Sequence, residues 1–140
     1  MNRLKSSLFV LLALMSFVVP VPAQTPLKDL QAKGLKPLSG EELSKLLPGN
    51  TLYHVNQRGF KVPLFYVPDG TRYVRIRGQV LESKWRIEGD KVCEYSVVLN
   101  KDVCRSLYRF EGGGAVCDDG ADVCEYGLDW AAGNAERFKN

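Results

Sequence analysis

Short alternating runs of apolar and polar residues fill the chain from Thr51 onward. Turn signals separate these runs, as in "PDG" at 68–70 and "EGD" at 88–90. The turns recur about every 8–12 residues, which is typical of antiparallel β proteins. No helix-length segment lies between the runs, so a parallel α/β sheet is not expected. The pattern predicts a mainly β fold, an antiparallel meander of about six or seven strands that forms a curled sheet or a small barrel.

One short helix is predicted ahead of the first strand. Ser39 is the expected N-cap, and Glu42 three residues later completes a capping box. An apolar face follows at helical spacing, formed by Leu43, Leu46 and Leu47. Pro48 and Gly49 end the helix. Because so short a helix is not stable alone, we expect it to pack against the sheet.

The N-terminus has the pattern of a secretory signal peptide. Arg3 and Lys5 precede an apolar stretch at 8–19, and small residues follow up to Ala23. The stretch is shorter than the roughly 20 residues that a membrane-spanning helix needs. We therefore expect a periplasmic or secreted protein that is not embedded in a membrane. Its expected parts are a signal peptide at 1–23, a flexible lead-in at 24–37 and a single β-rich domain at 38–140.

The four cysteines are expected to form two structural disulfides, because an exported protein meets an oxidising compartment. A hairpin turn between the members of each pair would place them opposite each other, which favours the pairs Cys93–Cys104 and Cys117–Cys124. The first pair is expected on the apolar side of the sheet. Zinc is not expected, since the chain has neither CxxC spacing nor nearby histidines.

The charge balance gives little support for a nucleic-acid partner. Once Arg3 and Lys5 leave with the leader, 17 basic groups stand against 16 acidic groups, a net charge of +1. The charges are unevenly spread, with a net charge of +5 over 58–109 and of −5 over 110–140. We expect the two segments to complement each other within one fold, and we do not expect nucleic-acid binding.

Basic residues recur opposite the apolar positions of several predicted strands. If these strands are neighbours, the side chains form a basic ladder on one sheet face, made of Arg75, Arg77, Lys84, Arg86, Arg105 and Arg109, with Tyr73 beside it. One interpretation is an ordinary solvated face. The other is a binding site for an anionic envelope component or an acidic protein partner, since guanidinium groups bind phosphate and carboxylate bidentately.

Candidates for catalysis or metal binding are few. His54 is the only histidine, and the spacing pairs it with neither a nucleophile nor an orienting carboxylate. Acidic residues gather near the C-terminus, at Asp118, Asp119, Asp122, Glu125 and Asp129, but their spacing departs from that of a calcium loop. The sequence therefore predicts a non-enzymatic protein without a cofactor, and it leaves calcium binding at 118–129 open.

Several motifs follow one another along the chain: "LSGEELSKLLPGNT", "YVPDGT", "KWRIEGDKVC" and "AAGNAERF". Together they resemble a group of small secreted domains of unknown function from Gram-negative bacteria, which carry a W-x-I-x-G-D-x-x-C hairpin. The residues that match this hairpin are Trp85, Gly89, Asp90 and Cys93, with Cys104 as the partner cysteine. The resemblance covers most of 38–138 and implies a lipocalin-like β fold in the periplasm. It implies no particular activity.

Two functional hypotheses follow from these features. The first is a periplasmic binding or interaction protein that presents a concave face, or the basic ladder, to a ligand or partner. The second is a disulfide-stapled envelope inhibitor or structural factor that inserts the loop between Cys117 and Cys124 into a protein partner. A catalytic role for His54 has less support, because no pair of residues with matched roles can be named.

Overall fold

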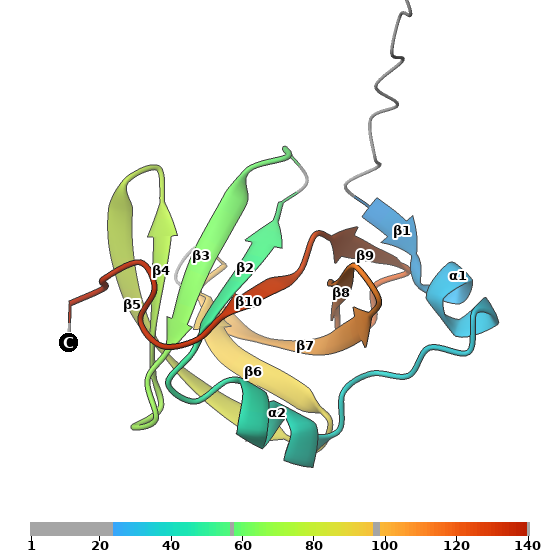
Figure 1. The fold of residues 1–140 in the computed structure, drawn as a ribbon, viewed down its shortest axis with the longest axis horizontal. Coiled ribbons are helices and arrows are strands. Elements are labelled where there is room, and N and C mark those ends of the chain that lie inside the picture. Colours follow the sequence, from blue (N-terminus) through green and yellow to red (C-terminus); the bar gives the residue numbers. More distant parts are fainter. Residues whose placement is uncertain (1–23, 57, 97–98, 140) are drawn as a thin grey trace, which may run out of the picture.

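The computed structural model describes residues 24–56, 58–96 and 99–139. The expected leader at 1–23 lies outside the described residues. This part of the chain forms two short helices and ten strands (Figure 1). They are β1 (Gln24–Pro26), α1 (Leu27–Ala32), α2 (Gly40–Leu46), β2 (Thr51–Val55), β3 (Lys61–Tyr66), β4 (Thr71–Ile76), β5 (Gln79–Glu88), β6 (Lys91–Ser96), β7 (Lys101–Phe110), β8 (Gly113–Asp118), β9 (Val123–Tyr126) and β10 (Asp129–Ala131). Within the described ranges, no helix has the length and apolar character needed to cross a membrane.

All ten strands belong to one antiparallel sheet, in the order β1-β9-β8-β7-β6-β5-β4-β3-β2-β10. From β2 to β9, each strand pairs with the next one along the chain, as in a meander. The edge strands β1 and β10 do not pair with each other, so the sheet is curled but not closed. The predicted antiparallel β meander is confirmed in its curled form. The described residues contain more strands than the turn spacing suggested, and a second helix.

The chain crosses from one end of the sheet to the other between β9 and β10. β9 pairs with β8, whereas β10 pairs with β2. Gly127 in this crossing has a φ of +88°, and a Cβ at this position would lie 2.6 Å from Cγ2 of Val55. Only glycine allows so close an approach with this backbone conformation. The crossing therefore holds the end of β9 against β2 and keeps the sheet curled.

The main core lies inside the curl. Side chains at alternate strand positions point inward, and the strand register carries this alternation from β2 to β9. The inner core consists of Leu52, Val62, Leu64, Tyr66, Val74, Trp85, Val92, Leu107, Val116 and Leu128. Helix α2 covers one end of this core with Leu43 and with its C-cap residue Leu47, which are fully buried. Its predicted capping box is present, with the Glu42 N–H donating to Ser39 Oγ and the Ser39 N–H donating to the Glu42 carboxylate.

A second, smaller core lies on the outer face of the sheet. Leu30 of α1 is buried there against Tyr108, Ala115 and the disulfide between Cys117 and Cys124. The segment 24–37 therefore differs from the expected flexible lead-in, because it carries β1 and α1. β1 pairs with β9, which completes the sheet edge. Helix α1 has no side-chain cap and buries one side chain, Leu30, so it lacks the capping box and the apolar face that revealed α2.

Both predicted disulfides are present. Cys93 bonds to Cys104 across β6 and β7, and Cys117 bonds to Cys124 across β8 and β9. The prediction that Cys93 and Cys104 lie on the apolar side of the sheet was wrong. Val92 belongs to the inner core, so its strand neighbour Cys93 points to the outer face. Both disulfides thus link neighbouring strands on the outer face of the sheet.

Candidate functional site: a cavity inside the curled sheet

A cavity of about 480 Å³ lies within the curl. One part of its wall is apolar and is formed by Val62, Leu64, Val74, Ile76, Leu81 and Val116. These side chains come from the inner faces of β3, β4, β5 and β8. Ile76 and Val123, which are 39% and 45% exposed, lie where the cavity opens to solvent. The cavity is a concave space with a mainly apolar surface, open at one end.

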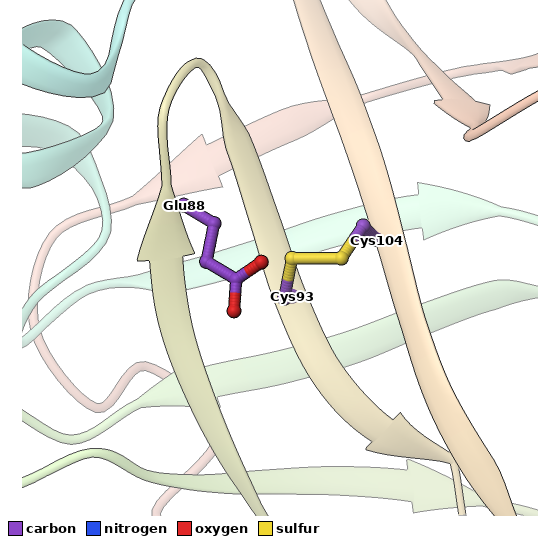
Figure 2. A group of neighbouring side chains, drawn as sticks. All are labelled: Glu88, Cys93 and Cys104. Carbon is purple, nitrogen blue, oxygen red and sulfur yellow. A yellow bond between two sulfur atoms is a disulfide. The ribbon is translucent and has the colours of Figure 1, made fainter.

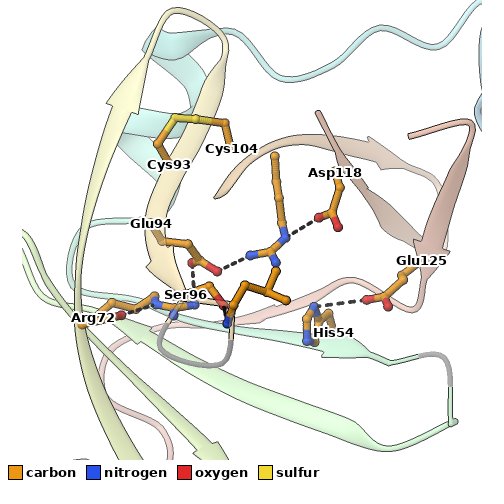
Figure 3. Close-up of polar contacts among 11 residues, drawn as sticks. His54, Arg72, Cys93, Glu94, Ser96, Cys104, Asp118 and Glu125 are labelled. Atoms are coloured by element: carbon orange, nitrogen blue, oxygen red, sulfur yellow. Dashed lines mark hydrogen bonds and ion pairs between the residues drawn. A yellow bond between two sulfur atoms is a disulfide. The ribbon is translucent and has the colours of Figure 1, made fainter. Parts of the chain in front are cut away.

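The other part of the wall is a network of charged side chains that runs from the buried Arg72 and Glu94 to the exposed Asp118. Glu94 lies between two guanidinium groups and pairs with both Arg72 and Arg105 (Figure 3). Arg105 Nε also donates to Asp118 Oδ1 at 2.6 Å, and Arg72 Nε donates to Ser83 Oγ at 3.1 Å. Arg72 and Glu94 are only 5% and 4% exposed. We call this set of Arg72, Glu94, Arg105 and Asp118 the inner charge network.

The strand register explains how the network assembles. Arg105 lies opposite Val92 on β6 and opposite Asp118 on β8, so all three side chains point into the curl. Glu94 is two residues beyond Val92 on the same face, which brings it within reach of Arg105. Buried charges are tolerated when each has a partner of opposite sign and further hydrogen bonds. Two arginines matched by two carboxylates meet this condition.

His54 also lines the cavity, from the inner face of β2. Burial, together with the positive charges of Arg105 and Arg72, lowers the pKa of His54 to about 4. The imidazole is therefore neutral at pH 7. Its Nδ1 lies 3.7 Å from Oε2 of Glu125, beyond hydrogen-bond distance. The structure thus places a carboxylate near His54, but not at the distance at which it would orient a general base.

The predicted basic ladder does not form as one surface. Arg105 points into the cavity, and Arg109 lies over the inward-facing Trp130 ring, at 5.4 Å from its centroid. Both residues share the face of the buried Leu107, because they lie two residues from it on β7. The interpretation failed there because it assumed that charged positions point away from the core. The charged residues of the inner charge network, Arg105 among them, point toward the core instead.

The remaining predicted basic residues lie elsewhere and are mostly engaged within the fold. Arg75 donates to the Glu136 carboxylate at 2.9 Å, and Tyr73 stacks against Phe138. The other contacts are Arg86 with Glu88 and Asp102, and Lys84 with the Thr71 hydroxyl. Arg77 lies in the exposed turn between β4 and β5. These partners favour a structural role for Arg75, Lys84 and Arg86.

The acidic residues near the C-terminus do not gather into a calcium site either. Four of the five lie near four different side chains, in the pairs Asp118–Arg105, Asp119–Lys91, Glu125–His54 and Asp129–Lys61, and Asp122 is exposed. Among the described residues, one group of three side chains of metal-ligating type lies close together, Glu88 with Cys93 and Cys104 (Figure 2). Both sulfur atoms are joined in a disulfide, so neither is a thiolate that could bind zinc.

Comparison with protein-family models, curated proteins and solved structures finds no match. The cavity must therefore be interpreted from its own geometry. The sequence interpretation missed Arg72 and Glu94, which form its most buried polar wall. A signal for them exists, because charges of opposite sign occur two residues from core positions on β4, β6, β7 and β8. These pairs are Arg72 with Val74, Val92 with Glu94, Arg105 with Leu107, and Val116 with Asp118.

Proposed function

We propose that this protein is a non-enzymatic binding protein that holds a small amphipathic molecule inside the curled sheet. The observation that carries the proposal is the cavity of about 480 Å³. Ligand pockets usually have volumes of roughly 300–1,000 Å³ and combine an apolar lining with a few fixed polar groups. This cavity has both, an apolar wall from β3, β4 and β5 and a polar wall from the inner charge network.

The polar wall suits recognition by hydrogen bonds. The charges of Arg72 and Arg105 are matched by those of Glu94 and Asp118, so the network needs no ligand charge to balance it. His54 is neutral, and Asn56 and Ser96 add uncharged polar groups to the wall. We expect the apolar part of the ligand to contact Leu64, Val74 and Leu81, and its polar end to face this wall.

A periplasmic or secreted location accords with this proposal. The pattern at 1–23 is typical of a leader that directs export. The two disulfides are of the kind that persists in oxidising compartments. The resemblance of the "KWRIEGDKVC" hairpin to small secreted domains of Gram-negative bacteria favours the periplasm.

A cavity-filling variant tests the proposal. Leu81 lines the cavity, whereas its neighbour Glu82 is exposed on the other face of β5. Leu81→Trp should fill the cavity, and Glu82→Trp adds the same indole outside it. The probe is the amphipathic dye anilinonaphthalene sulfonate, titrated by fluorescence. We expect saturable one-to-one binding by the wild type and by Glu82→Trp, and at least about tenfold weaker binding by Leu81→Trp. Equal binding by all three proteins would refute the proposal.

A further inference from the structure

The exposed apolar side chains of this protein gather at one end of the curled sheet. Among the described residues, six large apolar side chains are well exposed, with exposed fractions from 39% to 65%. They are Phe60, Ile76, Val80, Tyr95, Leu99 and Val123. Each lies close to one of four turns, those that follow β2, β4, β6 and β8. None lies at the turns that follow β3, β5 and β7.

The four turns surround the cavity opening. In an antiparallel meander, alternate turns lie at the same edge of the sheet. The residues next to them, Asn56, Ile76, Ser96 and Val123, all line the cavity. In Figure 1 the turns after β2 and β4 point away from α2, which covers the opposite end. We call the six exposed apolar residues the rim.

Basic groups accompany the rim. Arg58, Arg77 and Lys101 are exposed at three of its turns, and within the described ranges none of them forms an ion pair. The turns at the opposite end carry mainly acidic residues, namely Asp69, Glu88, Asp90 and Glu111, with Lys91 beside Asp90. The fourth rim turn is the exception, because three acidic residues lie there. Asp118 and Asp119 pair with Arg105 and Lys91, and Asp122 is exposed.

The turn after β4 gives independent support. Arg77 has a φ of +50° and Gly78 has a φ of +78°. In such a two-residue turn, asparagine or glycine adopts a positive φ with less strain than arginine. The turn thus keeps an exposed arginine at a position where asparagine or glycine would be less strained.

We propose that the rim docks onto the surface of an anionic lipid bilayer, with the cavity opening turned toward the membrane. Apolar side chains such as Phe60 and Leu99 would enter the boundary between headgroups and acyl chains. Arg58, Arg77 and Lys101 would contact the anionic headgroups, which attract exposed basic side chains near the surface. The docking depends on the rim and on these three basic residues, and it does not require a ligand in the cavity.

Vesicle flotation tests this proposal directly. The disulfide-bonded protein is mixed with vesicles of equal parts phosphatidylglycerol and phosphatidylcholine, or of phosphatidylcholine alone. We expect binding to the anionic vesicles that weakens as salt is added, because salt screens exposed charges. The variant Arg58→Glu/Arg77→Glu/Lys101→Glu should bind roughly a hundredfold more weakly. The matched control Lys28→Glu/Lys33→Glu/Lys36→Glu carries the same net charge, changes exposed residues outside the rim, and should stay within about threefold of the wild type.

A tryptophan reporter covers the case in which a rim variant folds poorly. Phe60 is 65% exposed, so Phe60→Trp should leave the fold intact. Its emission should shift to the blue on addition of anionic vesicles and be quenched by brominated lipids. An unchanged spectrum would refute insertion of the rim.

Other outcomes would also overturn the proposal. They are no flotation of the wild type, equal binding to neutral vesicles, or equal losses in the two charge-reversal variants. A dimer in sedimentation that is lost in Phe60→Ser/Leu99→Ser would assign the rim to self-association instead. Leu81→Trp should float like the wild type, because its change lies inside the cavity. The flotation test can therefore refute docking of the rim without refuting ligand binding in the cavity, and the dye titration can refute ligand binding without refuting docking.

Discussion

At the scale of single residues, Glu94 organises the inside of this protein. Its carboxylate is 4% exposed and contacts the guanidinium groups of both Arg72 and Arg105. The hydrophobic pattern of the sequence could not reveal this, because such a pattern assigns charged positions to the outer face. Only the strand register shows that these three residues point at one another. The part of the site that could be predicted was the apolar inner face, not the charges that share it.

Glu94→Gln should destabilise the protein strongly. Removing one partner of a buried ion pair leaves an uncompensated charge and costs about 3–5 kcal/mol. Urea unfolding at pH 7 measures this as a fall in the free energy of unfolding. Glu88→Gln is the matched control, because Glu88 pairs with Arg86 at the surface, where an ion pair contributes less than about 1 kcal/mol. Similar losses in the two variants would show that Glu94 is not held as the contacts indicate.

The lowered pKa of His54 predicts that the folded protein loses stability in mild acid. Its pKa is about 4 in the folded protein, against an ordinary value of 6.5. The unfolded chain therefore binds the proton more readily, so the contribution of His54 to stability is present above pH 6.5 and is lost as the pH falls toward 4. Between pH 7 and pH 5, the wild type should lose about 2 kcal/mol more than His54→Gln. Urea unfolding at both pH values measures the two losses, and equal losses in the two proteins would contradict the lowered pKa.

At the scale of elements, the sequence predicted those features that are stabilised by residues close together in the chain. The capping box, the hairpin turns and the two disulfide pairs each depend on residues close in sequence, and all are present. The "EGD" turn has a further role, because the Asp90 carboxylate accepts from the Gly40 N–H at 2.8 Å. This contact docks α2 on the turn between β5 and β6. β1 and α1 were missed because they are held by distant partners, namely β9 and the outer face of β7 and β8.

Gly127 offers a test of the crossing between β9 and β10. Gly127→Ala would place a Cβ 2.6 Å from Val55 Cγ2, in addition to the strain of a positive φ. Gly59→Ala is the matched control, because Gly59 has a φ of +77° with no atom near the new Cβ. Both should lose about 1 kcal/mol for the backbone strain, and Gly127→Ala about 1–3 kcal/mol more. Urea unfolding should resolve the difference, and equal losses would show that the close approach to Val55 is not tight.

At the scale of the whole molecule, the uneven charges along the chain meet within the fold. Four ion pairs join bases of 58–109 to acids of 110–140, and they are Lys61–Asp129, Arg75–Glu136, Lys91–Asp119 and Arg105–Asp118. This confirms that the two segments complement each other. The sequence could predict that balance but not the position of the partners, because the pairs depend on how the sheet curls. The same curl gathers the rim at one end of the cavity.

The C-terminal segment contributes to the whole molecule by covering the outer face of the sheet. After β10, the chain passes over β3 and β4, where Phe138 is 3% exposed and stacks with Phe65 and Tyr73 (Figure 1). The Arg75 guanidinium lies 4.7 Å from the centroid of the Phe138 ring. Phe138 thus buries one side of two aromatic rings that would otherwise face solvent.

Phe138→Ala should therefore destabilise the protein by about 3–5 kcal/mol, as is usual when a buried aromatic ring is removed. Phe60→Ala is the matched control, since Phe60 is 65% exposed and its loss should change the free energy of unfolding by less than about 0.5 kcal/mol. Urea unfolding measures both, and a small effect at Phe138 would mean that the segment does not hold its place on the sheet. Together the two phenylalanines separate stability from surface contact, because Phe138 should matter for folding and Phe60 for binding to lipid.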